Sequence, residues 1–254
     1  MKIKMIVCFF LYFNFISSQS FTATYTIKSV MFEDNEINEG YKNEIKSLFK
    51  NDIDTLKFNL LFKKNKFSFF YANTSNRLKN DNSNTIDFSK ISAENTGLYF
   101  VDIEKGIIQN EREDFGSLFI VQDSIKDIKW EISNEQKLID KYLCFKAIYK
   151  TTVTYNIDIG KTITKPRTVI AWFCPELPYS AGPLGFTGLP GLILELKNFS
   201  AVYLLKSFRL ENDINLVIPK KGKLLSRSNY ITEYNKLYDF WEYENMPEEL
   251  KVKK

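Results

Sequence analysis

The sequence contains no histidine, and this absence excludes several common kinds of chemistry. Ser-His-Asp and Cys-His catalysis, histidine general bases and zinc sites with imidazole ligands all need that side chain. Only three cysteines are present, at positions 8, 144 and 174, so thiolate zinc sites and iron–sulfur clusters lack ligands as well. The glycine motifs that bind nucleotide phosphates are also missing. We therefore expect no metal and no cofactor, and any catalysis would depend on carboxylate, lysine, tyrosine or serine side chains.

Long apolar runs are absent after the start of the chain, because no later stretch is apolar over the about 20 residues that a membrane helix needs. At the N-terminus, two lysines precede a mostly apolar run from Met5 to Ile16, and small polar residues follow up to Ser20. This order is typical of a secretory signal peptide. We expect residues 1–20 to form this signal, with cleavage after Ser18 or Ser20. The mature protein is then expected in the periplasm, at the outer membrane or outside the cell.

Neither sign of charge dominates the sequence. The 35 lysine and arginine residues and the 31 acidic residues give a net charge of +4, which falls to +2 when Lys2 and Lys4 are removed with the signal (4 − 2). A surface this close to neutral gives no electrostatic reason to expect a nucleic acid partner. Hydrophobic residues make up 44% of the sequence, which is enough for a substantial core. We expect residues 21–254 to form a single β-rich domain.

Alternation of apolar and polar residues is the most frequent local pattern, and it favours antiparallel strands joined by turns. It predicts strands at 22–27, 56–62, 67–71, 98–103, 117–122 and 127–132. Residues 41–50 have the spacing of a short amphipathic helix, whereas 73–90 are polar and are expected to form a loop. Near the C-terminus, apolar residues recur at helical spacing, so 229–245 are predicted to form a helix that ends before Pro247. The fold class expected from these patterns is mainly β, with one or two short helices.

An antiparallel hairpin is predicted between residues 142–155 and 166–174, which are both rich in β-branched and aromatic residues. Facing residues of such a pair have numbers with a constant sum, and a turn centred on Ile159 makes that sum twice 159, or 318. This register places apolar residues opposite one another, and it puts Cys144 opposite Cys174. In an oxidising compartment, two facing cysteines are expected to form a disulfide. The alternative is two reduced cysteines packed as small hydrophobes, while redox catalysis lacks the usual Cys-x-x-Cys spacing.

Residues 175–191 contain four of the seven prolines and four of the ten glycines, so they cannot form a regular strand or helix. The segment is nevertheless apolar and has a single charge, on Glu176. We therefore expect an ordered loop that lies against the sheet. Its last residues suit a type II turn, with Pro190 second and Gly191 at the third position, where φ is positive. The turn would lead into a strand that starts at Leu192.

The end of this loop resembles the signature of a known family. The signature consists of Gly188, Leu189, Pro190, Gly191, Leu192 and Ile193. Its flanks are also similar, namely Ala171-Trp172-Phe173, Pro175-Glu176-Leu177-Pro178, Gly182-Pro183 and Leu194-Glu195-Leu196. Together these segments resemble the GLPGLI family of exported bacterial proteins. The resemblance implies an envelope or secreted protein of unassigned function, and the family has no catalytic residues to carry over.

The same pattern is distantly similar to the bowl-shaped, non-catalytic N-terminal module of a type II peptide-N-glycosidase. That resemblance implies a fold and no activity. It predicts a curved antiparallel sheet with the shape of a bowl or a half-barrel.

The leading functional hypothesis is a non-catalytic binding or scaffold module for a glycan, a lipid or a protein partner, because recognition sites often lie on loops held by a rigid sheet. Glu176, Tyr179 and Phe186 in the loop and Trp172 in the preceding strand are the candidate binding residues. The loop can equally serve only to plug one end of the sheet. The alternative function is a carboxylate-dependent hydrolase that acts on polysaccharide, with Glu176 and Glu195 as acid and base. A structural part of a larger envelope assembly is the third possibility.

Overall fold

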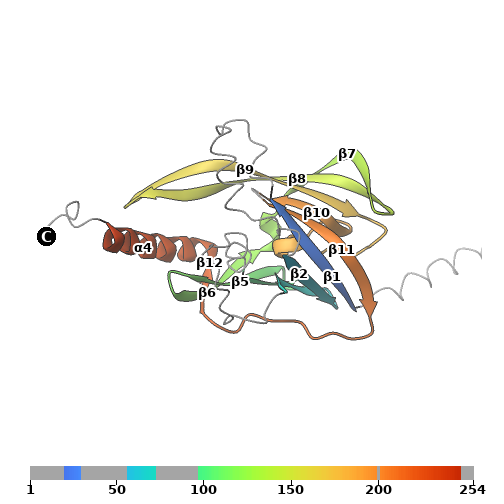
Figure 1. Ribbon diagram of the computed structural model, residues 1–254, viewed down its shortest axis with the longest axis horizontal. Coiled ribbons are helices and arrows are strands. Elements are labelled where there is room, and N and C mark those ends of the chain that lie inside the picture. Colours follow the sequence, from blue (N-terminus) through green and yellow to red (C-terminus); the bar gives the residue numbers. More distant parts are fainter. Residues whose placement is uncertain (1–19, 30–55, 73–96, 199–200, 247–254) are drawn as a thin grey trace, which may run out of the picture.

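The structure is a computed structural model that describes residues 20–29, 56–72, 97–198 and 201–246. Strands dominate this part of the chain, and a long helix lies near its C-terminus (Figure 1). The predicted mainly β class and C-terminal helix are therefore confirmed. Residues 1–19 of the predicted signal peptide, the predicted helix 41–50 and the predicted loop 73–90 lie outside the described residues.

Twelve strands form one sheet, and the long helix follows the last of them. The strands are β1 (Ser20–Ser29), β2 (Lys57–Lys63), β3 (Lys66–Tyr71), β4 (Leu98–Asp102), β5 (Ile107–Asp114), β6 (Ser117–Ser124), β7 (Trp130–Ile139), β8 (Tyr142–Asp158), β9 (Lys161–Cys174), β10 (Leu192–Asn198), β11 (Ala201–Glu211) and β12 (Lys223–Ser226). Within the described residues the helices are α4 (Arg227–Asn245) and two 3-10 turns, η3 (Ile125–Asp127) and η4 (Pro183–Gly185). The predicted strands appear close to their predicted positions, whereas β5, β11 and β12 were not predicted.

The order of strands across the sheet is β12-β6-β5-β4-β3-β2-β1-β11-β10-β9-β8-β7. The expectation of a purely antiparallel sheet is wrong at one edge, where β12 pairs with β6 in parallel. Residues 212–222, which connect β11 to β12, carry the chain across to this edge of the sheet. These residues cross the face of the sheet opposite to the main core, which we call the outer face. Ser68 Oγ on β3 donates there to the carbonyl oxygen of Val217 at 2.6 Å. The result is a large mixed sheet that is not closed into a barrel.

The register predicted for the central hairpin is confirmed over most of its length. Phe145 pairs with Phe173, and the constant sum of 318 continues as far as Asn156 and Thr162. A register shift then separates Asn156 from Asp158 before the turn. The long ladder makes β8 and β9 one two-stranded ribbon, which reaches beyond the rest of the sheet toward α4 (Figure 1).

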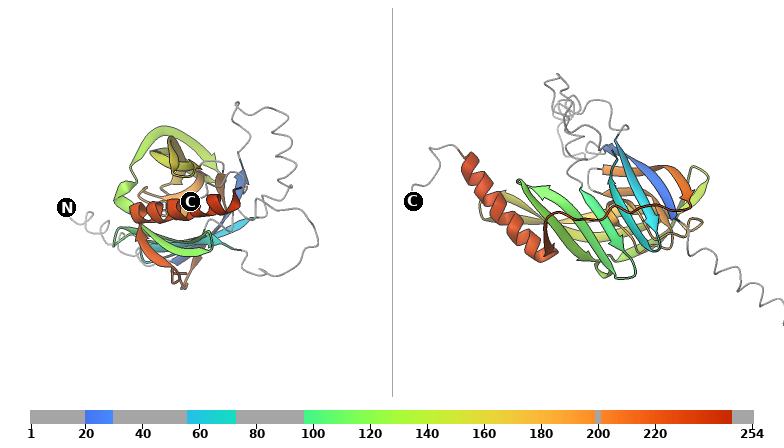
Figure 2. Two further views of the ribbon diagram at one scale, coloured as in Figure 1. Left: turned by 90° about the vertical axis from the view of Figure 1, so that its left-hand side faces the viewer. Right: turned by 90° about the horizontal axis from the view of Figure 1, so that it is seen from below.

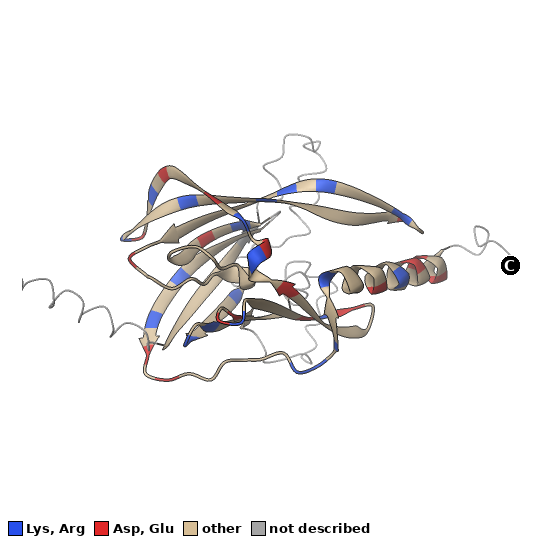
Figure 3. Cartoon of the chain, turned by 180° about the vertical axis from the view of Figure 1, so that it is seen from behind, with Lys and Arg blue, Asp and Glu red and all other residues tan. Residues whose placement is uncertain are grey.

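The main core lies on the inner face of the sheet, which we define as the face against which residues 175–191 pack. Its most completely buried large side chains include Phe21, Tyr25, Phe58, Leu60, Phe67, Phe69, Val101, Leu192 and Ile193. The sheet bends so that β8 and β9 lie across from β5 and β6, with the loop between them (Figure 2). A smaller second cluster, of Phe119, Val121 and Tyr230, packs α4 against β6. Charges of both signs are interspersed along the strands and α4 (Figure 3).

Candidate functional site

The Pro/Gly segment 175–191, here called the plug, packs into the interior of the sheet. Tyr179, Ala181 and Leu189 are each less than one-tenth exposed. The plug lies alongside the start of β10, because the N–H of Leu192 donates to the carbonyl of Leu177 at 2.8 Å and the N–H of Ile193 donates to that of Ala181 at 3.0 Å. The predicted ordered loop is thus present, and it is buried rather than presented to solvent.

Side-chain hydrogen bonds hold the far end of the plug. The Thr187 hydroxyl donates to the carbonyl oxygen of Ser180 at 2.5 Å, and the N–H of Gly188 donates to Ser180 Oγ at 2.9 Å. Trp130 Nε1, on β7, donates to the carbonyl oxygen of Thr187 at 2.8 Å. Since Thr187 is only 1% exposed, the bonds made by its hydroxyl and its carbonyl satisfy polar groups that have little access to water.

The predicted type II turn is wrong, because the φ angle of Gly191 is not positive. Positive φ angles occur earlier in the plug, at Leu184, Gly185 and Gly188. Gly191 is needed for a different reason, since a Cβ atom there would lie 2.2 Å from the carbonyl oxygen of Cys174. Gly182 has the same role, because its Cβ would lie 2.6 Å from the side chain of Ile193. These glycines let the plug approach the strands closely.

The four predicted binding residues do not form one group. Tyr179 is buried in an aromatic cluster, with its ring centroid 4.6 Å from that of Phe21. Phe186 is half-buried and packs against Trp130, with 5.8 Å between the ring centroids. Glu176 is exposed at the start of the plug. The plug therefore turns most of its candidate residues toward the core, and their role in binding stays a prediction.

Trp172 is half-buried and lies on the outer face of β9. Lys137 Nζ lies 4.3 Å from the centroid of its indole ring and also donates to Glu195 Oε2 at 2.7 Å. Glu195 is thus engaged in an ion pair on β10, while Glu176 follows the end of β9. These surroundings differ from a pair of carboxylates that face each other across a substrate.

Cys144 and Cys174 are both fully buried, and both are free thiols in the structure. Burial raises the pKa of each thiol, that of Cys144 to about 12. A negative charge on Cys174 would raise the pKa of Cys144 further, which indicates that the two side chains are close. The predicted disulfide is not formed in the structure, and it stays a prediction.

A second group of polar side chains, which the sequence analysis did not predict, lies between the plug and α4. We call it the arginine cluster, and its members are Tyr99 on β4, Arg112 and Asp114 on β5, Asp123 on β6, Arg167 on β9, and Arg227 and Tyr230 on α4. The strand positions place it on the inner face. Arg112 and Asp114 are an even number of positions from the buried Ile108 of β5, and Arg167 is two positions from the buried Val169 of β9, so each lies on the same face as that buried residue.

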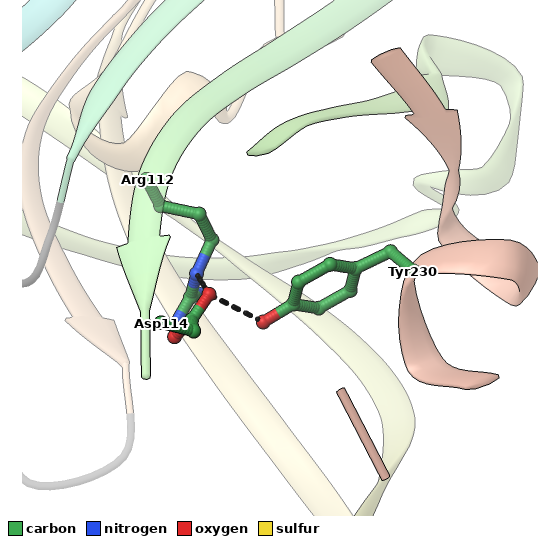
Figure 4. Close-up of polar contacts among 3 residues, drawn as sticks. All are labelled: Arg112, Asp114 and Tyr230. Carbon is green, nitrogen blue, oxygen red and sulfur yellow. Dashed lines mark hydrogen bonds and ion pairs between the residues drawn. The ribbon is translucent and has the colours of Figure 1, made fainter. Parts of the chain in front are cut away.

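Arg112 and Asp114 form the centre of the cluster (Figure 4). Arg112 donates to both carboxylate oxygens of Asp114, from Nε at 2.7 Å and from Nη2 at 2.6 Å. The Tyr230 hydroxyl donates to Asp114 Oδ2 at 3.0 Å, and the guanidinium carbon of Arg112 lies 5.5 Å from the Tyr230 ring centroid. Burial alone would lower the pKa of Arg112, but the hydrogen bonds and charge of Asp114 raise it overall. The guanidinium is thus held in a fixed orientation and remains charged.

Arg227, the first residue of α4, is held by an aspartate as Arg112 is. It forms an ion pair with both oxygens of Asp123, with its Nε 3.0 Å from Oδ1. Ser226 caps the helix, since its Oγ accepts from the N–H of Asn229 at 3.3 Å. The cap and the ion pair together fix the start of α4 beside β6.

Arg167 lies on β9, two positions before the buried Val169, which places it on the inner face of the sheet. Its positive charge also acts on the pKa of Tyr99. Burial raises the pKa of the Tyr99 hydroxyl, and the positive charges of Arg112, Arg227 and Arg167 act in the opposite direction. Three guanidinium groups therefore lie within electrostatic range of one tyrosine.

Sequence composition contained one signal for this cluster. The chain has thirty lysines and only five arginines, and three of those five are cluster members. Arginine differs from lysine in its planar fork of donors, which suits bidentate contacts. A search for arginines would have selected Arg112, Arg167 and Arg227 together with Arg77 and Arg209. Their spacing in sequence gives no reason to place any of them together.

Other kinds of site find little support in the part of the chain that the structure describes. It contains no group of three or more acidic or cysteine side chains arranged to hold a metal ion. Its helices include none with the length and apolar character needed to cross a membrane.

The described residues thus combine a large mixed sheet, a buried plug and an arginine cluster at the start of α4. A family model described as a protein of unknown function (Porph_ging) matches residues 130–195, which run from β7 into β10 and include the whole plug. No curated protein matches the chain.

Two solved structures of PNGF-II, in the C2 and P21 space groups, are similar to the chain. The TM-score is 0.49 for both, with 15% identity for the first and 14% for the second. Each match covers 87% of this chain and 33% or 34% of the PNGF-II chain. This chain thus spans about a third of the length of the structures that it matches.

Proposed function

We propose that this protein is an exported, non-catalytic binding module that holds a glycan, a lipid or a protein segment against the arginine cluster. The observation that carries this proposal is that the ion-paired Arg112 and Arg227, from β5 and α4, lie on the inner face of the sheet beside its apolar core, with Arg167 on the inner face of β9. Binding sites commonly combine apolar and aromatic walls with a few converging polar groups. The aromatic components here are Tyr99 and Tyr230.

The plug has the role of a scaffold in this proposal. Its buried side chains, its backbone bonds to β10 and its contact with Trp130 all supply rigidity. Gly185, at the tip of the plug, lies against β4 and β5, since a Cβ there would be 3.0 Å from side-chain atoms of Tyr99 and Ile108. The plug thus packs directly against the Tyr99 side chain. We propose that the sheet forms an open bowl, with the plug at one end and the ligand at the other.

Export is part of the same proposal, together with membership of the GLPGLI family. Strand β1 starts at Ser20, and Ser20 and Phe21 are both buried. Cleavage after Ser18 would leave β1 whole, so we favour that position over Ser20. An intact mass of the protein purified from its native envelope should correspond to a chain that starts at Gln19. A mass that retains the first eighteen residues would contradict export by this signal.

The binding proposal can be tested with the mature chain and hydrogen exchange measured by mass spectrometry. The chain is incubated with neutral oligosaccharides, acidic oligosaccharides, phospholipid vesicles and peptides in separate experiments. We expect one class to slow exchange in β5, β9 and the first turn of α4, without turnover of the ligand. Protection confined to the outer face around Trp172, or no protection by any class, would contradict the proposed site.

A further inference from the structure

We infer that two copies of this chain pair with each other along the free edge of β8, in antiparallel register, at the distal half of the β8–β9 ribbon (residues 150–168). The inference goes beyond the proposed function and does not depend on it, since it concerns another surface. It rests on three observations: an unpaired strand edge, the lack of protection along that edge, and a sequence that is complementary to itself.

The distal half of the ribbon has strand partners only within itself. Strand β7 pairs with β8 as far as Tyr149, and β10 pairs with β9 as far as Val169. Beyond these positions, β8 and β9 pair with each other up to the turn. Among the described residues, no other strand pairs with β8 from Lys150 to Asp158. Alternate backbone N–H and C=O groups along this edge therefore have no strand partner.

Helix α4 leaves this edge accessible. It packs on β6, which lies across from β8 and β9 (Figure 2), so it faces the inner side of the ribbon rather than the edge of β8. Thr152 and Thr154 are exposed, and Tyr155 and Ile157 are 36% and 60% exposed. An added strand would thus lie beside side chains that are open to solvent.

The edge of β8 lacks the features that keep other edges of the sheet from pairing. Natural edges are protected by charge, proline, bulges or short length. The free edge of β9 carries two charges and a proline at residues 165–167, β7 has a register shift between Ile132 and Gln136, and β12 has only four residues. By contrast, residues 151–157 of β8 contain no charge, no proline and no glycine. This segment consists mostly of β-branched and aromatic residues, so it is well suited to accept another strand.

The position of Pro166 indicates which backbone groups face the free edge of β8. Proline has no N–H, so the pair of Thr152 and Pro166 suits a position where the two residues do not bond across the ladder. Pairs alternate along a ladder, so Thr154 and Thr164 form a pair of the same kind, and the 2.9 Å between their hydroxyl oxygens fits the closer side chains of such pairs. The N–H and C=O groups of Thr152, Thr154 and Asn156 are then directed toward the free edge.

This edge is complementary to itself when Thr154 faces the partner's Thr154. The numbers of facing residues then sum to 308 (2 × 154). Val153 faces the partner's Tyr155, and Thr152 faces the partner's Asn156. Apolar side chains therefore meet on the inner face and polar side chains on the outer face, as cross-strand pairs prefer.

The charges at the ends of this segment favour the same register. It brings Lys150 close to the partner's Asp158 at both ends, whereas a sum of 306 would place Lys150 opposite the partner's Asn156. Within one chain, Lys150 and Asp158 form ion pairs with Glu131 and Lys161, but all four side chains are about half exposed or more. Exposed ion pairs contribute little to stability, so these side chains can turn to the partner. Charge pairs at the rim of an interface select the register more than they add affinity.

The test measures self-association of the mature chain by sedimentation velocity over about a hundredfold range of concentration. We expect a reversible equilibrium of monomer and dimer, since the interface is small. Thr154→Lys places like charges opposite each other, and we expect it to weaken association at least tenfold. The matched control is Thr164→Lys on β9, which removes the same hydroxyl pair away from the edge, and we expect it to associate as wild type does. Both variants should have the same melting temperature.

Cysteine substitutions test the register. Thr154→Cys places two thiols opposite each other, where the Cα atoms of a facing pair lie within the about 4.4 to 6.8 Å that a disulfide allows. We expect this variant to form a covalent dimer under mild oxidation. Val153→Cys faces the partner's Tyr155, and Thr164→Cys lies one strand away from the edge, so both should remain mostly monomeric. Non-reducing electrophoresis of the three variants measures the covalent dimer.

Several outcomes would overturn the inference. A mature chain that stays monomeric throughout the range would do so, even if β8 captured an extended peptide of another protein. A dimer that Thr154→Lys leaves intact would use another surface. Equal cross-linking of Thr154→Cys and Thr164→Cys would show chance collision and would also overturn the pairing of two β8 edges. None of these results bears on ligand binding at the arginine cluster, so the proposed function is tested separately.

Discussion

At the scale of single residues, glycine serves this protein in two different ways. Gly160, in the turn between β8 and β9, has a φ angle of +66° and open space around it, so it is needed for its conformation. Gly191 does not have a positive φ angle, and it is needed because the backbone of Cys174 lies where its side chain would be. A turn pattern in the sequence reveals the first role and not the second.

The Gly191→Ala variant tests this distinction. A Cβ atom 2.2 Å from a backbone oxygen forces the plug and β9 apart, so we expect a loss of clearly more than 1 kcal/mol in the free energy of unfolding. Gly160→Ala is the control, and its left-handed conformation alone should cost about 1 kcal/mol. Urea unfolding measures both values. A Gly191→Ala protein as stable as the control would show that the close contact is relieved without cost.

Asp102 is 2% exposed and provides a prediction about pH. Burial raises the pKa of its carboxyl, but the bonds from Lys66 Nζ at 2.8 Å and from the N–H of Lys105 at 3.1 Å lower it overall. A depressed folded pKa stabilises the protein above the unfolded value of about 3.9. That contribution is lost as the pH falls through the folded pKa. The difference in free energy of unfolding between wild type and Asp102→Asn should therefore be large at pH 7 and smaller at pH 3. Urea unfolding at both pH values measures this difference. A difference that does not change with pH would contradict the role of the Asp102 charge.

The two remaining cysteines provide a prediction about covalent structure. Protein secreted through the periplasm should contain one Cys144–Cys174 disulfide, which closes a loop of 30 residues (174 − 144) and stabilises the fold by roughly 3 to 4 kcal/mol in the chain-entropy model. Since burial and a raised pKa protect both thiols from reagents, alkylation must follow unfolding in denaturant. We expect no labelling without reductant and two labels with it. Two labels without reductant would rule out the disulfide.

At the scale of elements, the plug is held in place by its contacts with Trp130 on β7. Trp130 of β7 donates one buried hydrogen bond to it, and the ring packs against Phe186. Trp130→Phe keeps an aromatic ring but leaves the carbonyl of Thr187 without that donor, which should cost about 1 to 3 kcal/mol. Trp172→Phe, on the outer face, is the control and should cost less because its ring contact with Lys137 can persist. Equal losses in thermal unfolding would argue against a special role of Trp130.

At the scale of the whole molecule, the protein has one large core and one small one. The buried apolar contact of helix α4 with the rest is the small cluster of Phe119, Val121 and Tyr230. Its other contacts include the Arg227–Asp123 ion pair, the rings around the exposed Phe115, and the bond from the Gly160 N–H to Asp239. Regions with few buried contacts open at lower free energy than the main core. We therefore expect α4 to open locally while β1 and β10 remain protected.

Native-state hydrogen exchange tests this order of opening. The amides of α4 should exchange faster than those of β1, and Phe119→Leu should accelerate exchange in α4 without changing β1. Phe58→Leu in the main core is the control, since it should lower protection throughout the sheet. If α4 and β1 exchange at the same rate in wild type, the two cores unfold as one unit.

Local patterns in the sequence predicted much of the fold because each pattern has a local cause. Alternation identified β1 to β4, β6 and the β8–β9 hairpin, whose register follows from a constant sum of residue numbers. Helical spacing identified α4 to within two residues at its start, as the helix runs from Arg227 to Asn245. Strand β5 was missed since Ile107–Asp114 is mostly polar, and its inward-facing Asn110 and Arg112 do not continue the apolar alternation. Strand β12 was missed because it has only four residues.

The sequence by itself determined the β class, the central register, the C-terminal helix and an ordered loop at residues 175–191. The tertiary structure alone decided that this loop is a buried plug, that Gly191 is needed for a close approach, and that three arginines lie within electrostatic range of Tyr99. Arg112, Arg167 and Arg227 come from β5, β9 and α4, more than one hundred residues apart at the extremes (227 − 112 = 115). Their proximity depends on how far the sheet bends and where α4 is fixed. These properties arise from the sum of many weak packing contacts, so no single segment of sequence encodes them.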